Sequence, residues 1–178
     1  MKILILSIIV FIIDQLTKFL ARHWIGLGDS IRVFGDAFRL THVQNEGMAF
    51  GIMVGNKTIF TAFSIIAAVV ILYYLLKVRD QRFIFRFPLA LIFGGAIGNI
   101  FDRVVFGRVV DFLDVNIPDI SISSHKILFV KIPSIELTRW PVFNFADASV
   151  TIGMIMLFVA IFFAEEKKKS ENEIEVDS

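Results

Sequence analysis

Several ionisable side chains stand in or beside long apolar stretches of the sequence. Asp14 and Lys18 interrupt the first stretch, Asp102 and Arg103 end the third, and Asp147 lies near the start of the fourth. Charged side chains are costly inside a membrane, so those that occur there commonly serve a function. Their types and positions therefore indicate a polar site inside an apolar protein.

Asp111 and Asp147 are the two carboxylates best suited to chemistry, because both have apolar neighbours and neither has a lysine beside it. When two carboxyl groups share a low-dielectric site, one pKa rises, and the pair titrates together as one acid and one base. Such a pair can deprotonate a water for attack on a peptide carbonyl and protonate the departing nitrogen. The alternative, an interaction of Asp147 with its helix dipole, leaves Asp111 unexplained. The pattern predicts an aspartic peptidase dyad.

The other polar residues have simpler interpretations. Asp14 and Lys18 are four residues apart and can neutralise each other on one helix face, which favours a structural role. Arg103 has two open interpretations, since its long side chain could reach the membrane surface or orient a substrate. Residues 45–47 could form a turn before the second helix, and we expect Asp114 to be a solvated loop charge.

Other chemistries fit the sequence less well. The three histidines, His23, His42 and His125, are dispersed, and the chain has no cysteine, so we expect no metal site and no cofactor. Ser123 and Ser124 precede His125 directly, but adjacency in the sequence is not the geometry of a catalytic triad. The net charge of +1 favours no nucleic-acid partner.

The composition places these residues in a membrane protein. Of 178 residues, 56% are hydrophobic, whereas soluble domains carry about 45–50%. Four stretches reach the roughly 20 apolar residues that span a bilayer as a helix. We expect helices at about 2–24, 58–77, 83–103 and 143–164. The first could instead be a cleavable signal peptide, but no small-x-small cleavage site follows it, which favours a retained helix.

Basic residues set the expected orientation. They cluster at the start of the chain, between the second and third helices, and after the fourth: Lys2, Lys77, Arg79, Arg82, Arg86 and 167–169. Positive charge favours the cytoplasmic side, which places both termini there and residues 25–56 and 104–141 outside. Residues 1–164 then form a single integral membrane domain. The charged tail, 165–178, is expected to be cytoplasmic and disordered.

The outer segments and the third helix carry further patterns. Residues 31–43 alternate in places between apolar and polar, and residues 117–135 read as a hairpin, so we expect short strands. Gly94 and Gly98 form a small-xxx-small pair that favours close helix packing. Asp14 lies about 16 Å along the first helix at 1.5 Å per residue. The polar groups of three helices are therefore expected to converge in the outer half of the bilayer.

Five motifs, taken in order, give the chain a resemblance to a known family. They are DQLTK at 14–18, NEGMAFG at 45–51, GGAIGNIFDR at 94–103, GRVVDF at 107–112 and FNFAD at 143–147. With these motifs the chain resembles bacterial lipoprotein signal peptidase, also called signal peptidase II. The family's catalytic aspartates correspond to Asp111 and Asp147. Its supporting positions, which bind substrate or assist the dyad, correspond to Asp14, Lys18, Asn45, Gly47, Asn99, Asp102, Arg103 and Asn144.

The resemblance implies a substrate and an architecture. The substrate would be a prolipoprotein whose cysteine carries diacylglycerol, cleaved just before that cysteine. The fold class would be an all-α membrane protein with four transmembrane helices, a small periplasmic β-rich cradle and a short helix. We expect a monomer in contact with lipids in the bacterial inner membrane, with its active site near the periplasmic face. The chain departs from the family at Met48, where a small residue is usual, and in the long segment 114–140.

Two other functions use the same carboxylates. A small transporter or proton-conducting bundle is one alternative, although no inverted repeat is visible in the sequence. A noncatalytic scaffold subunit, in which the carboxylates form only helix-packing ion pairs, is the other. Asp→Asn substitutions separate these alternatives from a peptidase.

Overall fold

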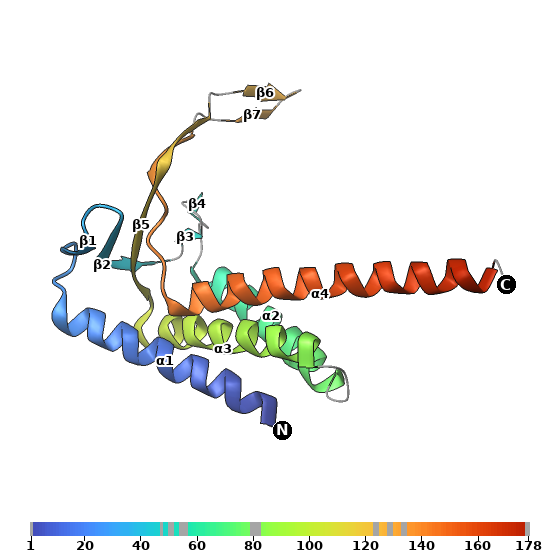
Figure 1. Cartoon of the computed structure of the whole chain (residues 1–178). Coiled ribbons are helices and arrows are strands. Elements are labelled where there is room, and N and C mark those ends of the chain that lie inside the picture. Colours follow the sequence, from blue (N-terminus) through green and yellow to red (C-terminus); the bar gives the residue numbers. More distant parts are fainter. Residues whose placement is uncertain are drawn as a thin grey trace.

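The computed structural model describes residues 2–46, 48–49, 52–53, 57–78, 83–122, 125–127, 130–132 and 135–176. Four long helices form a bundle, with the third helix in contact with each of the others (Figure 1). Each is long and apolar enough to cross a membrane, which confirms the four expected spans. The helices are α1 (Lys2–Trp24), α2 (Lys57–Lys77), α3 (Phe83–Phe106) and α4 (Phe145–Val176).

Small residues on α3 allow its neighbours to approach closely. A side chain at Gly94 would collide with the backbone of Ser7 in α1, and one at Gly95 would collide with the backbone of Ala146 in α4. The hydroxyl of Ser7 also donates to the carbonyl of Ala90, at 2.9 Å. Close helix packing through glycine, as the sequence predicts, is therefore confirmed for α1 on α3.

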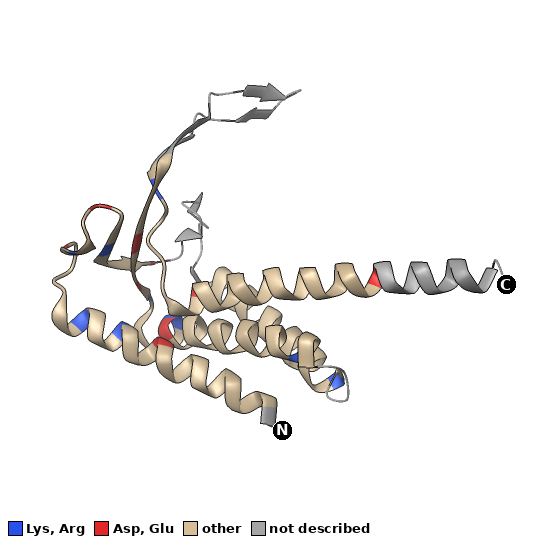
Figure 2. Ribbon diagram, viewed as in Figure 1, with Lys and Arg blue, Asp and Glu red and all other residues tan. Residues whose placement is uncertain are grey.

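The charges of the bundle lie mainly toward its two ends. In Figure 2 most of each helix is tan, and charged residues gather mainly where the sheet meets the helices and near the α2–α3 connection. The outward faces expose large apolar side chains such as Ile5, Ile8 and Ile12. This distribution is the one expected of helices that face lipid.

A four-stranded antiparallel sheet with the order β1-β2-β5-β8 stands at one end of the bundle. Figure 1 shows β5 leaving the end of α3 and running across the direction of the helices. Two short strand pairs, β3 with β4 and β6 with β7, complete the outer part. The strands are β1 (Ser30–Phe34), β2 (Phe38–Asn45), β3 (Met48–Ala49), β4 (Ile52–Met53), β5 (Val109–Ile122), β6 (His125–Ile127), β7 (Val130–Ile132) and β8 (Ile135–Arg139).

The sheet is fastened to the end of α1. Val110 and Phe112 of β5 are buried in a cluster with Ala21 of α1. The Nδ1 of buried His42 lies 2.8 Å from the carbonyl of Ile25, just beyond the last turn of α1. Because that carbonyl has no partner within the helix, the contact ties the helix end to β2.

The structure differs from the expectations in several places. The outer segments form strands, as predicted, so the description all-α is wrong for this part. The expected short outer helix is not found among the described residues, where every element other than the four long helices is a strand. The helical backbone of α4 continues to Val176, and the disorder expected of residues 165–178 stays a prediction. Glu and Lys, which dominate this tail, are strong helix formers.

Candidate active site

Asp111 reaches the bundle end because of the turn that precedes β5. Gly107 has a φ of 70°, and its N–H donates to the carbonyl of Arg103 at 3.1 Å, which ends α3. The chain then enters β5, where Asp111 pairs in register with Val43 of β2. A left-handed glycine after the helix thus folds the chain back toward the helix end.

The carboxylate of Asp111 is buried and accepts hydrogen bonds from two amides. The side chain of Asn45 in β2 donates to Oδ2 at 3.1 Å, and the side chain of Asn144 donates to Oδ1 at 2.7 Å. Only 3% of Asp111 is exposed. Both of its oxygens are therefore oriented by protein groups.

Asp147 lies in the first turn of α4 and takes part in its N-cap. Its Oδ2 accepts from the backbone N–H of Asn144 at 3.2 Å, and its own N–H donates to Oδ1 of Asn144 at 2.9 Å. This reciprocal arrangement satisfies two donors that the helix start leaves open. The other oxygen, Oδ1, accepts from the side chain of Asn99 in α3, at 2.7 Å. Asp147 therefore caps the start of α4, as the alternative interpretation of this residue supposed, and it also contacts Asn99 of α3.

Asn144 is the residue that joins the two aspartates. Its side chain donates to Asp111, and it exchanges hydrogen bonds with Asp147. The preceding residue, Phe143, forms a β-bridge with Leu113, with hydrogen bonds of 2.7 and 3.0 Å between the two backbones. This bridge fixes the start of α4 against β5 and so brings both carboxylates onto one fully buried asparagine.

The electrostatics of Asp111 follow from this setting. Burial, with a smaller contribution from the negative charge of Asp147, raises the pKa of Asp111 to about 7. The hydrogen bonds from Asn45 and Asn144 oppose this shift because they stabilise the charged form. Near neutral pH, Asp111 can therefore hold a proton beside a second carboxylate, which is what a shared acid and base require.

A buried ion cluster lies beside the two aspartates. The ammonium of Lys18 lies 2.8 Å from Asp14 and 3.0 Å from Asp102, and all three side chains are fully buried. It also donates to Oδ1 of Asn99 at 2.9 Å, and the amide of Asn99 donates onward to Asp147. Lys18 is thus connected to Asp147 through the side-chain amide of Asn99. The hydrogen bond from Lys18 orients that amide toward Asp147.

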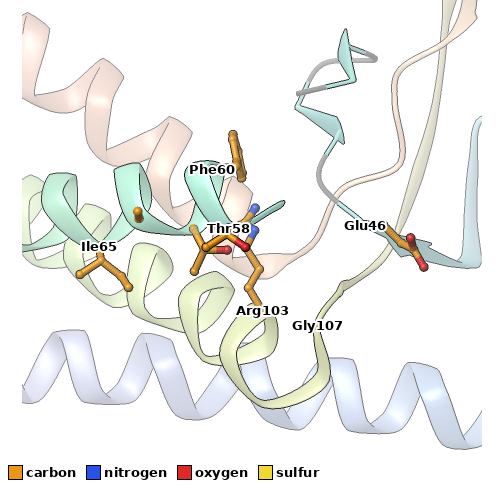
Figure 3. A pocket seen from close by; sticks show the side chains of 8 residues that line it. Glu46, Thr58, Phe60, Ile65, Arg103 and Gly107 are labelled. Carbon is orange, nitrogen blue, oxygen red and sulfur yellow. The ribbon is translucent and has the colours of Figure 1, made fainter. Parts of the chain in front are cut away.

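Arg103 points away from this cluster although it is adjacent to Asp102. Its guanidinium lies over the ring of Phe60 in α2, 4.6 Å from the centroid, and Figure 3 shows the two side chains close together. It is close enough to feel the charges of Asp111 and Asp147. The structure therefore brings six of the eight supporting residues together around the two aspartates: Asp14, Lys18, Asn45, Asn99, Asp102 and Asn144. Arg103 faces α2 instead, and Gly47 lies outside the described residues.

Comparison with known proteins decides the family. Residues 6–163 match the family described as signal peptidase (SPase) II. This chain belongs to the signal peptidase II family. The lipoprotein signal peptidase of Syntrophus aciditrophicus (strain SB) is 35% identical over 170 residues, covering 93% of this chain and 94% of that protein. The lipoprotein signal peptidase of Staphylococcus aureus (strain MRSA252) is 32% identical, covering 94% and 92%.

Solved structures of bacterial membrane enzymes share the fold of this signal peptidase II family member. One, determined by the in meso method at 2.3 Å resolution, superposes with a TM-score of 0.72 at 30% identity, covering 94% of this chain and 91% of that chain. A second, at 1.9 Å resolution, gives a TM-score of 0.66 at 31% identity, covering 90% and 92%. The resemblance drawn from the five motifs is confirmed.

The sequence interpretation missed two features of the site and misjudged another residue. Gln15 donates to both Asp14 and Asp102, at 3.1 and 3.2 Å, and its position beside Asp14 was the only signal available. Phe60 lies in an apolar helix and gave no signal at all. Asp114 is not a solvated charge. It is 5% exposed, and Arg139 of β8 donates to it at 2.7 Å.

Proposed function

We propose that this chain removes the signal peptide from prolipoproteins that carry a diacylglyceryl cysteine, cleaving just before that cysteine. Asp111 and Asp147 act as an aspartic dyad that activates water. The observation that carries this proposal is the shared asparagine, since Asn144 binds both carboxylates while burial raises the pKa of Asp111 to about 7.

The two carboxyl groups divide the work. Asp147, whose two oxygens accept hydrogen bonds from Asn99 and from the backbone of Asn144, acts as the base. The ionised carboxylate takes a proton from water, whose oxygen attacks the scissile carbonyl. The proton held on Asp111 passes to the carbonyl oxygen. Asp147 then passes the proton taken from water to the departing nitrogen, while Asp111 recovers a proton from the tetrahedral diol. Bond breaking leaves one proton on the pair again, so the cycle closes.

The position of the dyad suits a lipid-anchored substrate. Asp111 follows α3, and Asp147 opens α4, at the bundle end where the sheet stands. We place this end at the outer face of the bacterial inner membrane, with both chain termini in the cytoplasm. A substrate held in the outer leaflet by its acyl chains would then present its scissile bond at the depth of the dyad.

Conservative substitution of each aspartate tests this function. Asp111→Asn and Asp147→Asn keep the shape of the side chain but remove its titration, so each variant should lower cleavage of a diacylglyceryl prolipoprotein by a factor on the order of 10³ or more. The readout is the gel shift of the purified substrate in detergent micelles. Asp36→Asn, at an exposed aspartate between β1 and β2, is the matched control and should cleave normally. Normal cleavage by either dyad variant would overturn the mechanism.

A further inference from the structure

An apolar cavity of about 330 Å³ lies between α1, α2 and α3. Among the residues that line it, α3 contributes Phe93 and Ile97, α1 contributes Ser7 and Phe11, and α2 contributes Leu72. The cleavage mechanism proposed above uses none of these side chains. The cavity therefore has no explanation in the chemistry of the two aspartates.

The size and chemistry of the cavity suit an acyl chain. Its described lining is apolar except for Ser7, whose hydroxyl already donates to the carbonyl of Ala90 at 2.9 Å. A helix 10–12 Å in diameter occupies roughly 400–600 Å³ per turn, so one turn of a transmembrane helix is larger than this cavity. A slender apolar chain fits where a helix does not.

The cavity is placed where a membrane lipid can reach it. Ile8, which also lines it, is 57% exposed, and Phe11 and Leu72 are half-buried. Only 28% of the α1 span and 11% of the α2 span are buried inside the bundle. Both helices that flank α3 here face the surrounding bilayer, so an acyl chain enters the cavity directly from it.

Arg86 stands on the same face of α3 as the cavity. It precedes Phe93 by seven residues and Ile97 by eleven, which places it within about 20° of each around the helix and about 10 Å along from Phe93. The Nε of Arg86 is buried and has no hydrogen-bond partner among the described residues. A buried donor needs an acceptor, and phosphate is a strong acceptor for a guanidinium.

The end of the bundle where Arg86 lies is basic. Figure 2 shows basic residues near the α2–α3 connection. In the sequence, Lys77, Arg79, Arg82 and Arg86 stand against a single acid, Asp80. Basic clusters beside a membrane span attract anionic lipid headgroups. Charge therefore favours an anionic lipid over a zwitterionic one at this end.

We propose that Arg86 and the cavity form a binding site for one anionic phospholipid. The lipid belongs to the leaflet at the α2–α3 end, which is the cytoplasmic leaflet in the orientation proposed above. Its phosphate binds the guanidinium of Arg86, and one acyl chain lies between α1 and α2 against Phe93 and Ile97. The bound lipid joins α1 to α2 and stabilises the bundle. The site goes beyond the proposed function, because it takes no part in cleavage.

Lipid-dependent melting of the full chain tests the headgroup contact. The melting temperature in dodecyl maltoside micelles is measured while dioleoyl phosphatidylglycerol is added, and again with dioleoyl phosphatidylcholine, which has the same chains but no net charge. Each titration gives an apparent Kd. Arg86→Gln is compared with Lys77→Gln, the matched control. Lys77 lies at the same end but about 140° around α2 from Leu72, and its ammonium is over the exposed ring of Tyr73, 5.8 Å from the centroid.

The unsubstituted protein should bind phosphatidylglycerol about tenfold more tightly than phosphatidylcholine, the size of one charged hydrogen bond. Arg86→Gln should lose this preference, and Lys77→Gln should keep it. Each variant is compared on two lipids, so a change in its own stability does not enter the ratio. Equal affinity of the unsubstituted protein for both lipids refutes the proposal. Equal losses in the two variants also refute it, since they indicate only a general attraction of charge.

Filling the cavity tests the acyl-chain contact independently. Leu72→Trp should weaken phosphatidylglycerol binding about tenfold, equal to the loss of roughly two buried methylene groups. Ile66→Trp, at a position 59% exposed and about 120° around α2, is the control and should bind normally. Native mass spectrometry should show one retained phosphatidylglycerol per chain. Dimers that Leu72→Trp disrupts, with no effect of the added lipid, would assign the cavity to a second copy of the chain and end the proposal.

Discussion

At the scale of single residues, the proposed dyad predicts a specific pH dependence of cleavage. Because the pKa of Asp111 is about 7, its proton is lost and kcat/KM should fall as the pH rises through about 7. Asn45 donates to the charged form of Asp111, so Asn45→Ala should raise this pKa and move the alkaline limb to higher pH. Profiles of kcat/KM against pH for both enzymes measure the shift. Gln44→Ala, one residue away on β2, should leave the profile in place, and an unmoved limb in Asn45→Ala would contradict the assignment.

The same titration affects stability, with a defined sign. The pKa of Asp111 in the folded protein lies above the ordinary value of 3.8, so its contribution to stability is fully present below about pH 4 and is lost as the pH rises through about 7. Asp111→Asn cannot ionise. Its melting temperature in detergent should therefore rise relative to the unsubstituted protein between pH 4 and pH 8. A difference between the two that stays constant with pH would show that Asp111 does not titrate in this range.

Residue types and apolar surroundings pointed to Asp111 and Asp147, and the structure brings both carboxylates onto Asn144. Residue types and surroundings were not sufficient for residues whose role depends on a partner from another element. Gln15 bridges two aspartates of different helices, and Asp114 is buried only because Arg139 of β8 pairs with it. A local sequence pattern does not predict such pairings. From the sequence alone, an aspartate in a polar segment is expected to be solvated, and its burial becomes evident only from the sheet.

At the scale of elements, Gly98 of α3 sets the distance between α1 and the polar cluster. A side chain at this position would collide with the carboxylate of Asp14, which cannot move without leaving Lys18. Gly98→Ala should therefore destabilise the protein by about 1–3 kcal/mol and lower cleavage. Melting temperature and cleavage assays measure both effects.

The control for this substitution separates packing from backbone freedom. Gly35 has a φ of 55°, and a side chain there would meet nothing within 4 Å. Gly35→Ala should cost about 1 kcal/mol through the backbone alone and leave cleavage unchanged. If Gly98→Ala behaved like Gly35→Ala, the close approach of α1 and α3 would not matter for the site.

Helices were easier to predict than strands, for a physical reason. An apolar run of spanning length can satisfy its own backbone only as a helix, so composition decides the element. A strand needs a partner, and β5 finds three in β2, β8 and the Phe143 bridge. Its start at Val109 depends on the left-handed turn at Gly107, which the hairpin pattern at 117–135 did not include.

At the scale of the whole molecule, Lys18 is the point where three helices are joined. It contacts Asp14 on its own helix and Asp102 and Asn99 on α3, and Asp14 in turn accepts from the backbone of Ala146 in α4, at 2.9 Å. The cluster holds one cation, Lys18, between two carboxylates. Removing the cation therefore leaves the buried negative charge of those carboxylates uncompensated. Electrostatics and packing of the bundle therefore depend on the same side chain.

Lys18→Met should destabilise the protein by about 3–5 kcal/mol, the usual effect of removing one partner from a buried pair. Lys77→Met, at an exposed lysine that ends α2, is the control and should change the melting temperature little. Adding Asp102→Asn to Lys18→Met removes one of the two stranded charges, so the double variant should melt above the single one. A double variant that melts lower would show that Asp102 contributes through its hydrogen bond from Gln15 rather than through its charge. If the helices are held together by the balance of charge between Lys18 and its two aspartates, the double variant must regain stability.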